Sequence, residues 1–376
     1  MNSKRSGPTK LVVLAAAAMF IAAACGGSSA TASPSAAATA APTAAPSVAA
    51  SVAPSVAPTA ATNPNADSVY SPLATSPCDV SGKNIYFLSI LKGHPTLRLW
   101  QQGFLDQAKI LGYKTATIAS PDAADWAAAV SLGEQILATD TPGSYAMVFG
   151  FIDPTEKDLI KKFADKGVPV VLGHVEAPEG SYPGMLAWSA YSSPKWATDA
   201  AMAIGHKIGG KGTVAITEGS FNVQEDLVAT TFTAVLKANY PDVKVLAPQE
   251  EGFDSPVAIA KAVAILQANP DVVAALSTTG AGPVTWAGAA DQTGRTVAAI
   301  GPDMTRPNLD AVRDGKIFGL AAQPGYEEHE QAVDLATIAL CGGKIKSYAN
   351  ELPAPIVFKD GLAPYYVIVD RIDARK

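Results

Sequence analysis

The side chains that could carry out acid–base or metal chemistry are few in this chain and widely spaced. Three aspartates, Asp153, Asp226 and Asp303, could supply the pair of carboxylates that hydrolysis of a glycosidic bond requires. The same carboxylates could instead accept hydrogen bonds from the hydroxyl groups of a ligand without reacting. The chain has four histidines: His94, His174, His206 and His329. None lies in the His-Glu-x-x-His spacing of a zinc-binding helix, so the sequence predicts no metal site.

Sequence motifs of the common enzyme classes are also missing. There is no Gly-x-Ser-x-Gly nucleophile elbow and no glycine-rich phosphate loop ending in Lys-Ser or Lys-Thr. The stretch Gly209-Gly210-Lys211-Gly212 is typical of a turn between a helix and a strand. We therefore predict a protein that is not an enzyme and needs no cofactor.

Short apolar runs alternate with amphipathic segments along the chain, and these elements must position the candidate residues. The predicted strands include 84–90, 145–149 and 168–172, and the predicted helices include 96–111, 123–138, 155–166 and 195–208. The same alternation continues from 213 to 293. We expect an α/β protein with two parallel sheets, helices on both faces of each, and a ligand at the carboxyl ends of the strands.

The N-terminus carries an export signal. Basic residues precede the apolar run 11–24, which is shorter than the roughly 20 residues that span a bilayer. The sequence Ala22-Ala23-Ala24-Cys25 is similar to a bacterial lipobox, in which the cysteine is acylated and becomes the mature N-terminus. We expect 1–24 to be a lipoprotein signal peptide and Cys25 to anchor an extracytoplasmic protein to the bacterial cell membrane. An ordinary cleaved signal with a chance cysteine is the alternative.

Residues 25–77 are predicted to form the lipid anchor and a disordered tether. The stretch 28–67 consists almost wholly of Ala, Ser, Thr, Pro and Val, which bury too little surface to offset the entropy of ordering. Removal of the signal takes away Lys4, Arg5 and Lys10, so the formal charge falls by 3, from −6 to −9. An acidic body argues against nucleic acid as a partner.

Motifs at the ends of the predicted strands resemble those of a known family. They are His94-Pro95-Thr96-Leu97 with Gly103-Phe104, Asp153-Pro154-Thr155, Gly252-Phe253-Asp254, Asn269-Pro270-Asp271-Val272, Gly301-Pro302-Asp303, Asp314-Gly315-Lys316 and Ala321-Ala322-Gln323-Pro324. In this order they resemble the ribose-type sugar-binding proteins, which are type I periplasmic solute-binding proteins of ABC importers. The resemblance covers everything from Lys83 to the C-terminus. It implies two doubly wound parallel-sheet lobes joined by three hinge crossings.

The resemblance also implies how the chain divides. The first binding lobe would comprise 78–188 plus 324–362, and the second would comprise 189–323 plus 363–376. The crossings are expected near 188–191, 323–326 and 360–364. In that topology the helix from about 326 to 340 ends at the pole where the first strand begins, so Cys78 and Cys341 could meet there in a disulfide. Two unpaired thiols are the alternative.

The ligand-binding positions of the family fall on polar and aromatic residues of this chain. Asp303 and Gln323 occupy positions that hold sugar hydroxyls, and Phe253 occupies that of a stacking ring. Thr279 and Asp153 replace amide side chains that bind hydroxyls. Other interpretations stay open: Asp303 as the cap of a turn, Gln323 as a hinge residue, Phe253 as a core ring, and Thr279 or Asp153 facing solvent.

The sequence departs from the family at three places, which puts ordinary ribose recognition in doubt. His174-Val175 stands where the family commonly has Asp-Arg, and Asp226 stands where it commonly has a second Arg. Two bidentate contacts from arginine are therefore lost. The aromatic pair that follows Pro95 in the family is replaced by Thr96 and Leu97.

Other residues are candidates to replace the lost contacts. Trp188 lies at the first expected crossing and is predicted to supply the missing ring, with Trp100 and Trp286 as further candidates. A tryptophan inside a helix, such as Trp100, is more often part of the core. His94 and His174 could each contact the ligand or only support a turn.

The resemblance implies a function as well as a fold. We expect a monomer that captures a sugar or sugar-like polyol between two lobes and delivers it to an ABC permease in the membrane. A sensor that signals to a membrane receptor remains an alternative, and an exported carbohydrate-active enzyme is a weaker one. The identity of the sugar and the number of membranes in the envelope stay open.

Overall fold

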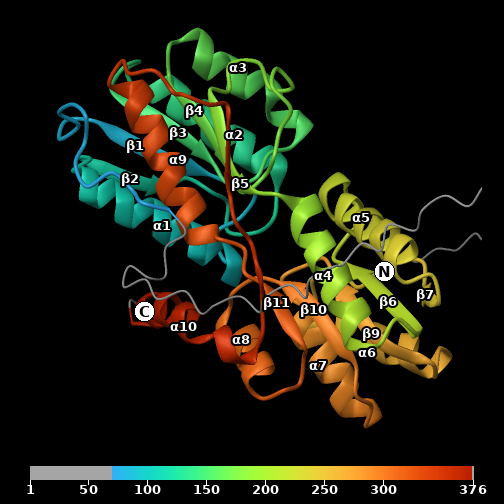
Figure 1. Ribbon diagram of the computed structural model, residues 1–376. Helices are drawn as coiled ribbons and strands as arrows, with labels where there is room; N and C mark the ends of the chain where they lie inside the picture. The colour runs from blue at the N-terminus through green and yellow to red at the C-terminus, as the bar shows by residue number, and fades with distance from the viewer. Residues whose placement is uncertain (1–69, 375–376) are drawn as a thin grey trace, which may run out of the picture. The chain divides into compact units, whose positions relative to one another are not determined.

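Two β-sheets, each covered by helices on both faces, form the part of the chain that the structure describes (Figure 1). The structure is a computed structural model and describes residues 70–374. The predicted signal peptide, the lipidation site Cys25 and most of the predicted tether lie outside the described residues. Between residues 70 and 374, no helix is long and apolar enough to cross a membrane.

The first sheet has the strand order β12-β5-β4-β3-β1-β2, and all its strand pairs are parallel. Its strands are β1 (Asn84–Leu88), β2 (Thr115–Ile118), β3 (Tyr145–Phe149), β4 (Val170–Gly173), β5 (Ala187–Tyr191) and β12 (Ala349–Leu352). Its helices are α1 (Pro95–Leu111), α2 (Trp126–Thr139), the short 3₁₀ helix η1 (Pro154–Glu156), α3 (Lys157–Asp165) and α9 (Gly325–Leu340). Ile85 and Phe87 pack against α1 and α9, whereas Val170 and Leu172 pack against α2 and α3. We call this sheet with its helices the first lobe.

The second sheet has the order β13-β11-β10-β9-β6-β7, with β8 paired to β6, and only the pair of β13 with β11 is antiparallel. Its strands are β6 (Gly212–Glu218), β7 (Val243–Val245), β8 (Gln249–Glu250), β9 (Val272–Ser277), β10 (Ala298–Pro302), β11 (Gly319–Ala321) and β13 (Ile356–Val357). Its helices are α4 (Ser193–Lys207), α5 (Val223–Asn239), α6 (Ser255–Ala268), α7 (Gly282–Thr293), α8 (Arg306–Arg313) and α10 (Ala363–Asp373), with the 3₁₀ helix η2 (Lys359–Gly361) before α10. Val214 and Ile216 pack against α4 and α5, while Ala215 and Ala275 pack against α6 to α8. This sheet with its helices is the second lobe.

Several helices begin where the sequence places a capping side chain. The carboxylates of Asp125 and Asp254 accept hydrogen bonds from backbone N–H groups at the starts of α2 and α6. Ser192 and Asn222 do the same for α4 and α5. Such caps satisfy N–H groups that have no partner within the helix, which fixes the loops after the strands.

The chain passes between the sheets three times, but two passages differ from the expected positions. β5 runs to Tyr191 because it pairs on both sides, with β4 and β12, so the first passage follows Tyr191. The second passage lies between Ala321 and Gly325, as expected. The third passage was expected at 360–364 and instead lies between Leu352 and Ile356, because β13 joins the second sheet beside β11. Residues 189–191 therefore belong to the first lobe and residues 356–362 to the second.

The last residues of the predicted tether are bound to the first lobe, contrary to the expectation that the tether is disordered up to 77. The Asp334 carboxylate on α9 is buried and accepts hydrogen bonds from the Tyr70 hydroxyl at 2.7 Å and the Leu73 N–H at 2.8 Å. Gln107 on α1 donates to the Leu73 carbonyl at 2.9 Å. A buried carboxylate needs such donors, and this segment supplies them.

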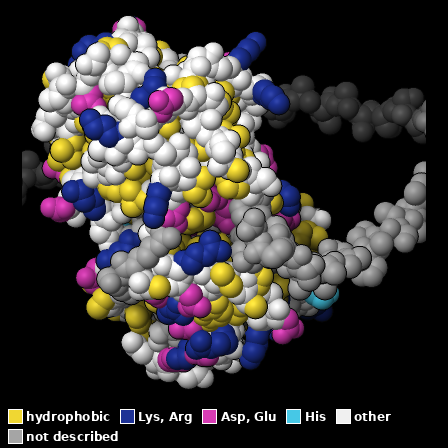
Figure 2. All heavy atoms as spheres, turned by 90° about the vertical axis from the view of Figure 1, so that its left-hand side faces the viewer, with side chains coloured by type: hydrophobic (Ala, Val, Ile, Leu, Met, Phe, Trp, Pro, Cys, Tyr) yellow, Lys and Arg dark blue, Asp and Glu magenta, His cyan; other side chains and the backbone are white. Residues whose placement is uncertain are grey.

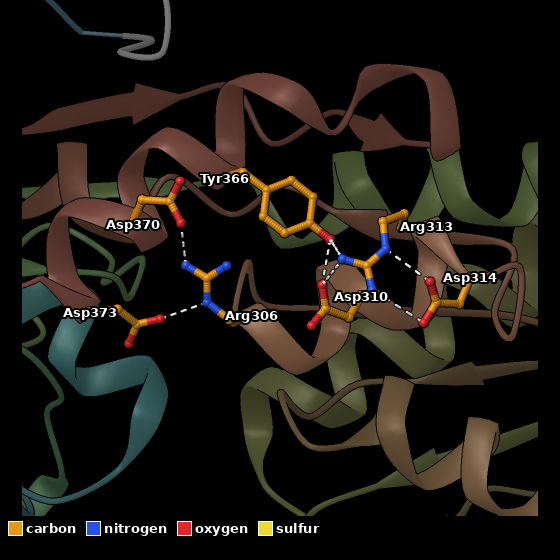
Figure 3. Close-up of polar contacts among 7 residues, drawn as sticks. All are labelled: Arg306, Asp310, Arg313, Asp314, Tyr366, Asp370 and Asp373. Atoms are coloured by element: carbon orange, nitrogen blue, oxygen red, sulfur yellow. Dashed lines mark hydrogen bonds and ion pairs between the residues drawn. The ribbon is translucent and has the colours of Figure 1, made fainter.

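Helix α10 is held to α8 by ion pairs (Figure 3). The Arg306 guanidinium binds the carboxylates of Asp370 and Asp373 on α10, the latter at 2.6 Å. The Tyr366 hydroxyl donates to Asp310 at 2.7 Å. Helix α8 directly follows the loop that carries Asp303, so these contacts fix the element behind the candidate site.

Basic and acidic side chains are interspersed on the molecular face drawn in Figure 2. Nucleic-acid-binding surfaces instead gather Lys and Arg into a patch or stripe. The described residues on this face show no such patch (Figure 2).

Cys78 and Cys341 form a disulfide across a sequence separation of 263 residues, which confirms the pairing that the family resemblance implied. We expect its removal to lower the free energy of unfolding by about 2 to 5 kcal/mol, because the bond restricts a very long loop of the unfolded chain. Urea unfolding of Cys78→Ser, with Cys25→Ser as the matched control, measures this. Equal stability of the two variants would contradict it.

Candidate functional site

The Asp303 carboxylate lies between the two lobes. Asp303 directly follows β10, is only 6% exposed, and has a positive φ of 72°, a conformation that aspartate tolerates better than most residues. Its Oδ2 atom accepts a hydrogen bond from the hydroxyl of Thr96, which lies in the first turn of α1 in the first lobe. A carboxylate of the second lobe is thus hydrogen-bonded by the first lobe.

The loop around Asp303 is held by its own neighbours. The Asn308 amide on α8 donates to the carbonyls of Gly280 at 2.8 Å and Asp303 at 3.0 Å. A side chain at Gly280 would collide with the Asp303 carboxylate, so glycine is required there. Asp303 is therefore fixed in place, and it is not merely the cap of α8, whose N-cap residue is Thr305.

The electrostatics of Asp303 also depend on the first lobe. Burial raises the pKa of Asp303, and the hydrogen bond from Thr96 and the nearby rings of His174 and His94 oppose that rise. His94 is itself the N-cap of α1, where its Nδ1 accepts from the Thr96 N–H at 3.3 Å. His94 therefore supports a turn and acts on Asp303 at the same time.

His174 lies in a cluster of aromatic rings. It follows β4 with a positive φ of 71°, and its ring centroid lies 4.0 Å from that of Trp100. Phe151 and Tyr191 complete the cluster at centroid distances of 5.5 and 5.3 Å from His174. The Nδ1 atom of His174 lies 3.0 Å from a carboxylate oxygen of the buried Glu328 on α9. Burial raises the pKa of Glu328, and the contact with His174 opposes this.

Gln323 contacts Tyr191 at the junction of two passages between the lobes. Its amide nitrogen donates to the Tyr191 hydroxyl at 2.6 Å, and Gln224 on α5 donates to the same hydroxyl at 3.3 Å. Tyr191 ends β5 and Gln323 follows β11. This geometry supports the hinge interpretation of Gln323, since its amide nitrogen is engaged by the other passage.

A group of carboxylates lies at the same edge of the second sheet. Glu218 ends β6, and Glu225 and Asp226 lie in the first turn of α5. Glu225 accepts hydrogen bonds from the Gly219 N–H at 2.6 Å and the Thr278 hydroxyl at 2.5 Å. Asp226 is therefore close to other acids at the place where the family commonly has an arginine.

The other predicted site residues, Thr279, Phe253 and Asp153, differ in their exposure to solvent and in their neighbours. Thr279 is 9% exposed and lies beside Gly219, whose other neighbour is the ring of Phe253. Phe253 is 64% exposed, so it is not a core ring. Asp153 caps η1, where it accepts from the Thr155 N–H at 2.9 Å in a capping box completed by Glu156.

Two tryptophans proposed for the site belong to the core, and the third lies beside His174. The expectation that Trp188 supplies the missing ring is wrong, because the alternation of β5 turns Trp188 and Ala190 toward the core between the sheet and α2 and α3. Trp286 packs in the second-lobe core and donates to the Thr217 hydroxyl at 3.0 Å. Trp100 is buried but lies against His174.

Sequence reasoning missed several residues that meet here. In the sequence Thr96 stands out only as the loss of an aromatic ring, and no motif marks Glu328, Tyr191 or Glu218. One signal was available for Glu328: the run Glu327-Glu328-His329-Glu330 begins a helix that had to be buried, and buried charges are uncommon without a partner.

Across residues 70–374 no group of three or more His, Cys, Asp or Glu side chains could hold a metal ion.

Asp153 provides a test of which aspartates serve the site. We expect Asp153→Ala to lower the free energy of unfolding by about 1 kcal/mol, because it removes a helix N-cap, and to leave ligand affinity unchanged. Asp153→Asn should restore the stability, since asparagine caps as well as aspartate. A loss of ligand affinity in both variants would instead place Asp153 at the ligand.

Solved structures share this fold. A glucose–galactose binding protein from Geobacillus stearothermophilus superimposes with a TM-score of 0.67 at 21% identity, covering 75% of this chain and 99% of that one. A solute-binding protein from Actinobacillus succinogenes 130z with bound D-allose has a TM-score of 0.68 at 19% identity, with coverage of 74% and 99%. A solute-binding protein from Bacillus halodurans C-125 with bound myo-inositol has a TM-score of 0.67 at 14% identity, with coverage of 77% and 99%.

The family follows from the sequence match rather than from these superpositions. Residues 85–344, more than half of the chain, match the periplasmic binding protein domain. The two doubly wound lobes and three passages are the type I arrangement of that fold. The chain is therefore a member of the periplasmic binding protein family.

Proposed function

We propose that this chain is an extracytoplasmic substrate-binding lipoprotein of an ABC importer, which captures a sugar or sugar-like polyol between its lobes and delivers it to a membrane permease. Several structural relatives are sugar-binding proteins of ABC transporters, with ligands such as D-allose and myo-inositol. Membrane attachment through Cys25 and a monomeric state are parts of this proposal. Catalysis is not.

The observation that carries the proposal is the position of Asp303. A sugar hydroxyl donates well to a carboxylate, and the half-buried ring of Phe151, in the cluster around His174, suits the apolar face of a sugar. Asp303 belongs to the second lobe, whereas Thr96, Trp100 and His174 belong to the first. A ligand that replaces the Thr96 hydroxyl on Asp303 would be held by both lobes, which is how closure about hinge segments captures a solute.

The ligand-binding role is tested by a thermal-shift screen of pentoses, hexoses, polyols and inositols. A ligand that binds only the folded state raises the melting temperature by mass action. We expect Asp303→Asn to weaken binding of the best ligand about 10- to 100-fold, as for the loss of a hydrogen bond to a charged group. Asparagine tolerates the positive φ of this position, so the variant should fold.

Asp153→Asn is the matched control for this experiment, because it makes the same chemical change at an aspartate that caps a helix. Its affinity should equal that of the unmodified protein. Unchanged affinity in Asp303→Asn would contradict the proposed site.

A further inference from the structure

Four carboxylates gather at one edge of the second lobe without a basic partner. We call Glu218, Glu225, Asp226 and Glu251 the acidic edge. Glu218 ends β6 and Glu251 follows β8, the strand beside it. In the described part of the chain, no Lys or Arg side chain forms an ion pair with any of the four. Lys261 is attracted to Glu251 but donates to the carbonyl of Glu250 at 2.9 Å.

The four carboxylates are not equally satisfied. Glu225 accepts three hydrogen bonds, from the Gly219 N–H, the Thr278 hydroxyl and the Asn222 amide. Glu218 is 1% exposed, yet its Oε2 atom has no hydrogen-bond donor. The Asp226 carboxyl lies close enough to act on Glu218, and as a carboxylate it is also an acceptor. Burial and the carboxyls of Asp226 and Glu225 raise the pKa of Glu218 to about 8.

Two neighbouring carboxylates require a positive charge or a shared proton. A resident metal does not fit, since no metal-binding group of side chains exists among residues 70–374. In the unliganded protein, burial and the neighbouring carboxyls favour a protonated Glu218 by raising its pKa. Asp226 is exposed, so a ligand group can reach it and take the place of that proton.

The acidic edge is close enough to Asp303 for one small ligand to contact both. In the second sheet β9 lies between β6 and β10. The end of β6 at Glu218 is therefore two strand spacings, about 10 Å, from the end of β10 beside Asp303. Thr279 follows β9, the strand between β6 and β10. It lies close to the end of β6, since a Cβ atom added at Gly219, the residue after Glu218, would be 2.9 Å from the Thr279 Oγ1 atom. The exposed ring of Phe253 lies beside the same glycine, where a Cβ atom would be 2.6 Å from the ring.

We propose that the Glu218–Asp226 pair binds an ammonium group of the ligand, so that the substrate class is an amine-bearing sugar or aminocyclitol whose hydroxyls contact Asp303. This inference rests on the proposed function and names its substrate class. An ammonium group donates three hydrogen bonds and lets both carboxylates ionise, which a hydroxyl cannot do. The same edge repels sugar phosphates and sugar acids.

Matched ligand pairs test the inference by isothermal titration calorimetry at pH 6.5. D-glucosamine is compared with D-glucose and N-acetyl-D-glucosamine. D-galactosamine is compared with D-galactose and N-acetyl-D-galactosamine. We expect each free amine to bind at least about tenfold more tightly than its neutral partners, as for one charge-assisted hydrogen bond. Ethanolamine, which offers the ammonium without the ring, should bind far more weakly.

The variants assign the preference to the pair. Glu218→Gln and Asp226→Asn should each bring the amine and neutral affinities together, whereas Glu134→Gln, the same change at a carboxylate exposed on α2, should leave the preference intact. Asp226 is exposed, so Asp226→Asn should fold and keeps the test valid if Glu218→Gln fails to fold.

The outcomes separate this inference from the function on which it rests. Neutral sugars that bind through Asp303 as tightly as the amines would overturn the inference and leave the proposed function standing. Ethanolamine that binds as tightly as the amino sugars would also overturn it. Failure of every sugar, neutral or amine, to bind would remove the proposed function and this inference together.

Discussion

The contact between Thr96 and Asp303 is the interaction on which the rest of the structure depends. Removing a carboxylate from water is unfavourable unless other groups replace the lost hydrogen bonds. The second lobe supplies the Asp303 carboxylate, and the first lobe supplies its hydroxyl donor and two nearby imidazole rings. Neither lobe satisfies this group alone. The carboxyl ends of two sheets that are distant in sequence must therefore meet at one point.

Many local features serve that meeting point. Asp303 and His174 are the non-glycine residues with positive φ among the described residues, and each directly follows a central strand. Asn308 fixes the Asp303 loop from α8, and Arg306 fixes α8 to α10. Gln323 joins Tyr191 where two passages lie together. Backbone strain and buried polar contacts are thus concentrated where the two lobes touch, as is common at functional sites.

The sequence predicted the fold well and the site in part, for physical reasons. Strands buried on both faces read as continuous apolar runs, and the capped helices between them are local features, so the α/β alternation could be recognised without the structure. Asp303 and His174 could be found because they directly follow strands. The role of Thr96 could not, because its partner lies 207 residues away. Trp188 failed as a candidate because one step of strand alternation decides which face it occupies.

The proposed role of the acidic edge would give the site a ligand preference that the fold alone does not determine. Structures with bound D-allose or myo-inositol share the fold at 14 to 19% identity, so the fold alone does not determine which ligand is bound. A crystal structure of the protein with its best-binding sugar tests the central claim most directly. We predict a ligand oxygen within hydrogen-bonding distance of the Asp303 carboxylate, in the place of the Thr96 hydroxyl, with first-lobe groups on the opposite side of the ligand. A ligand bound in one lobe alone, with Asp303 still paired to Thr96, would contradict it.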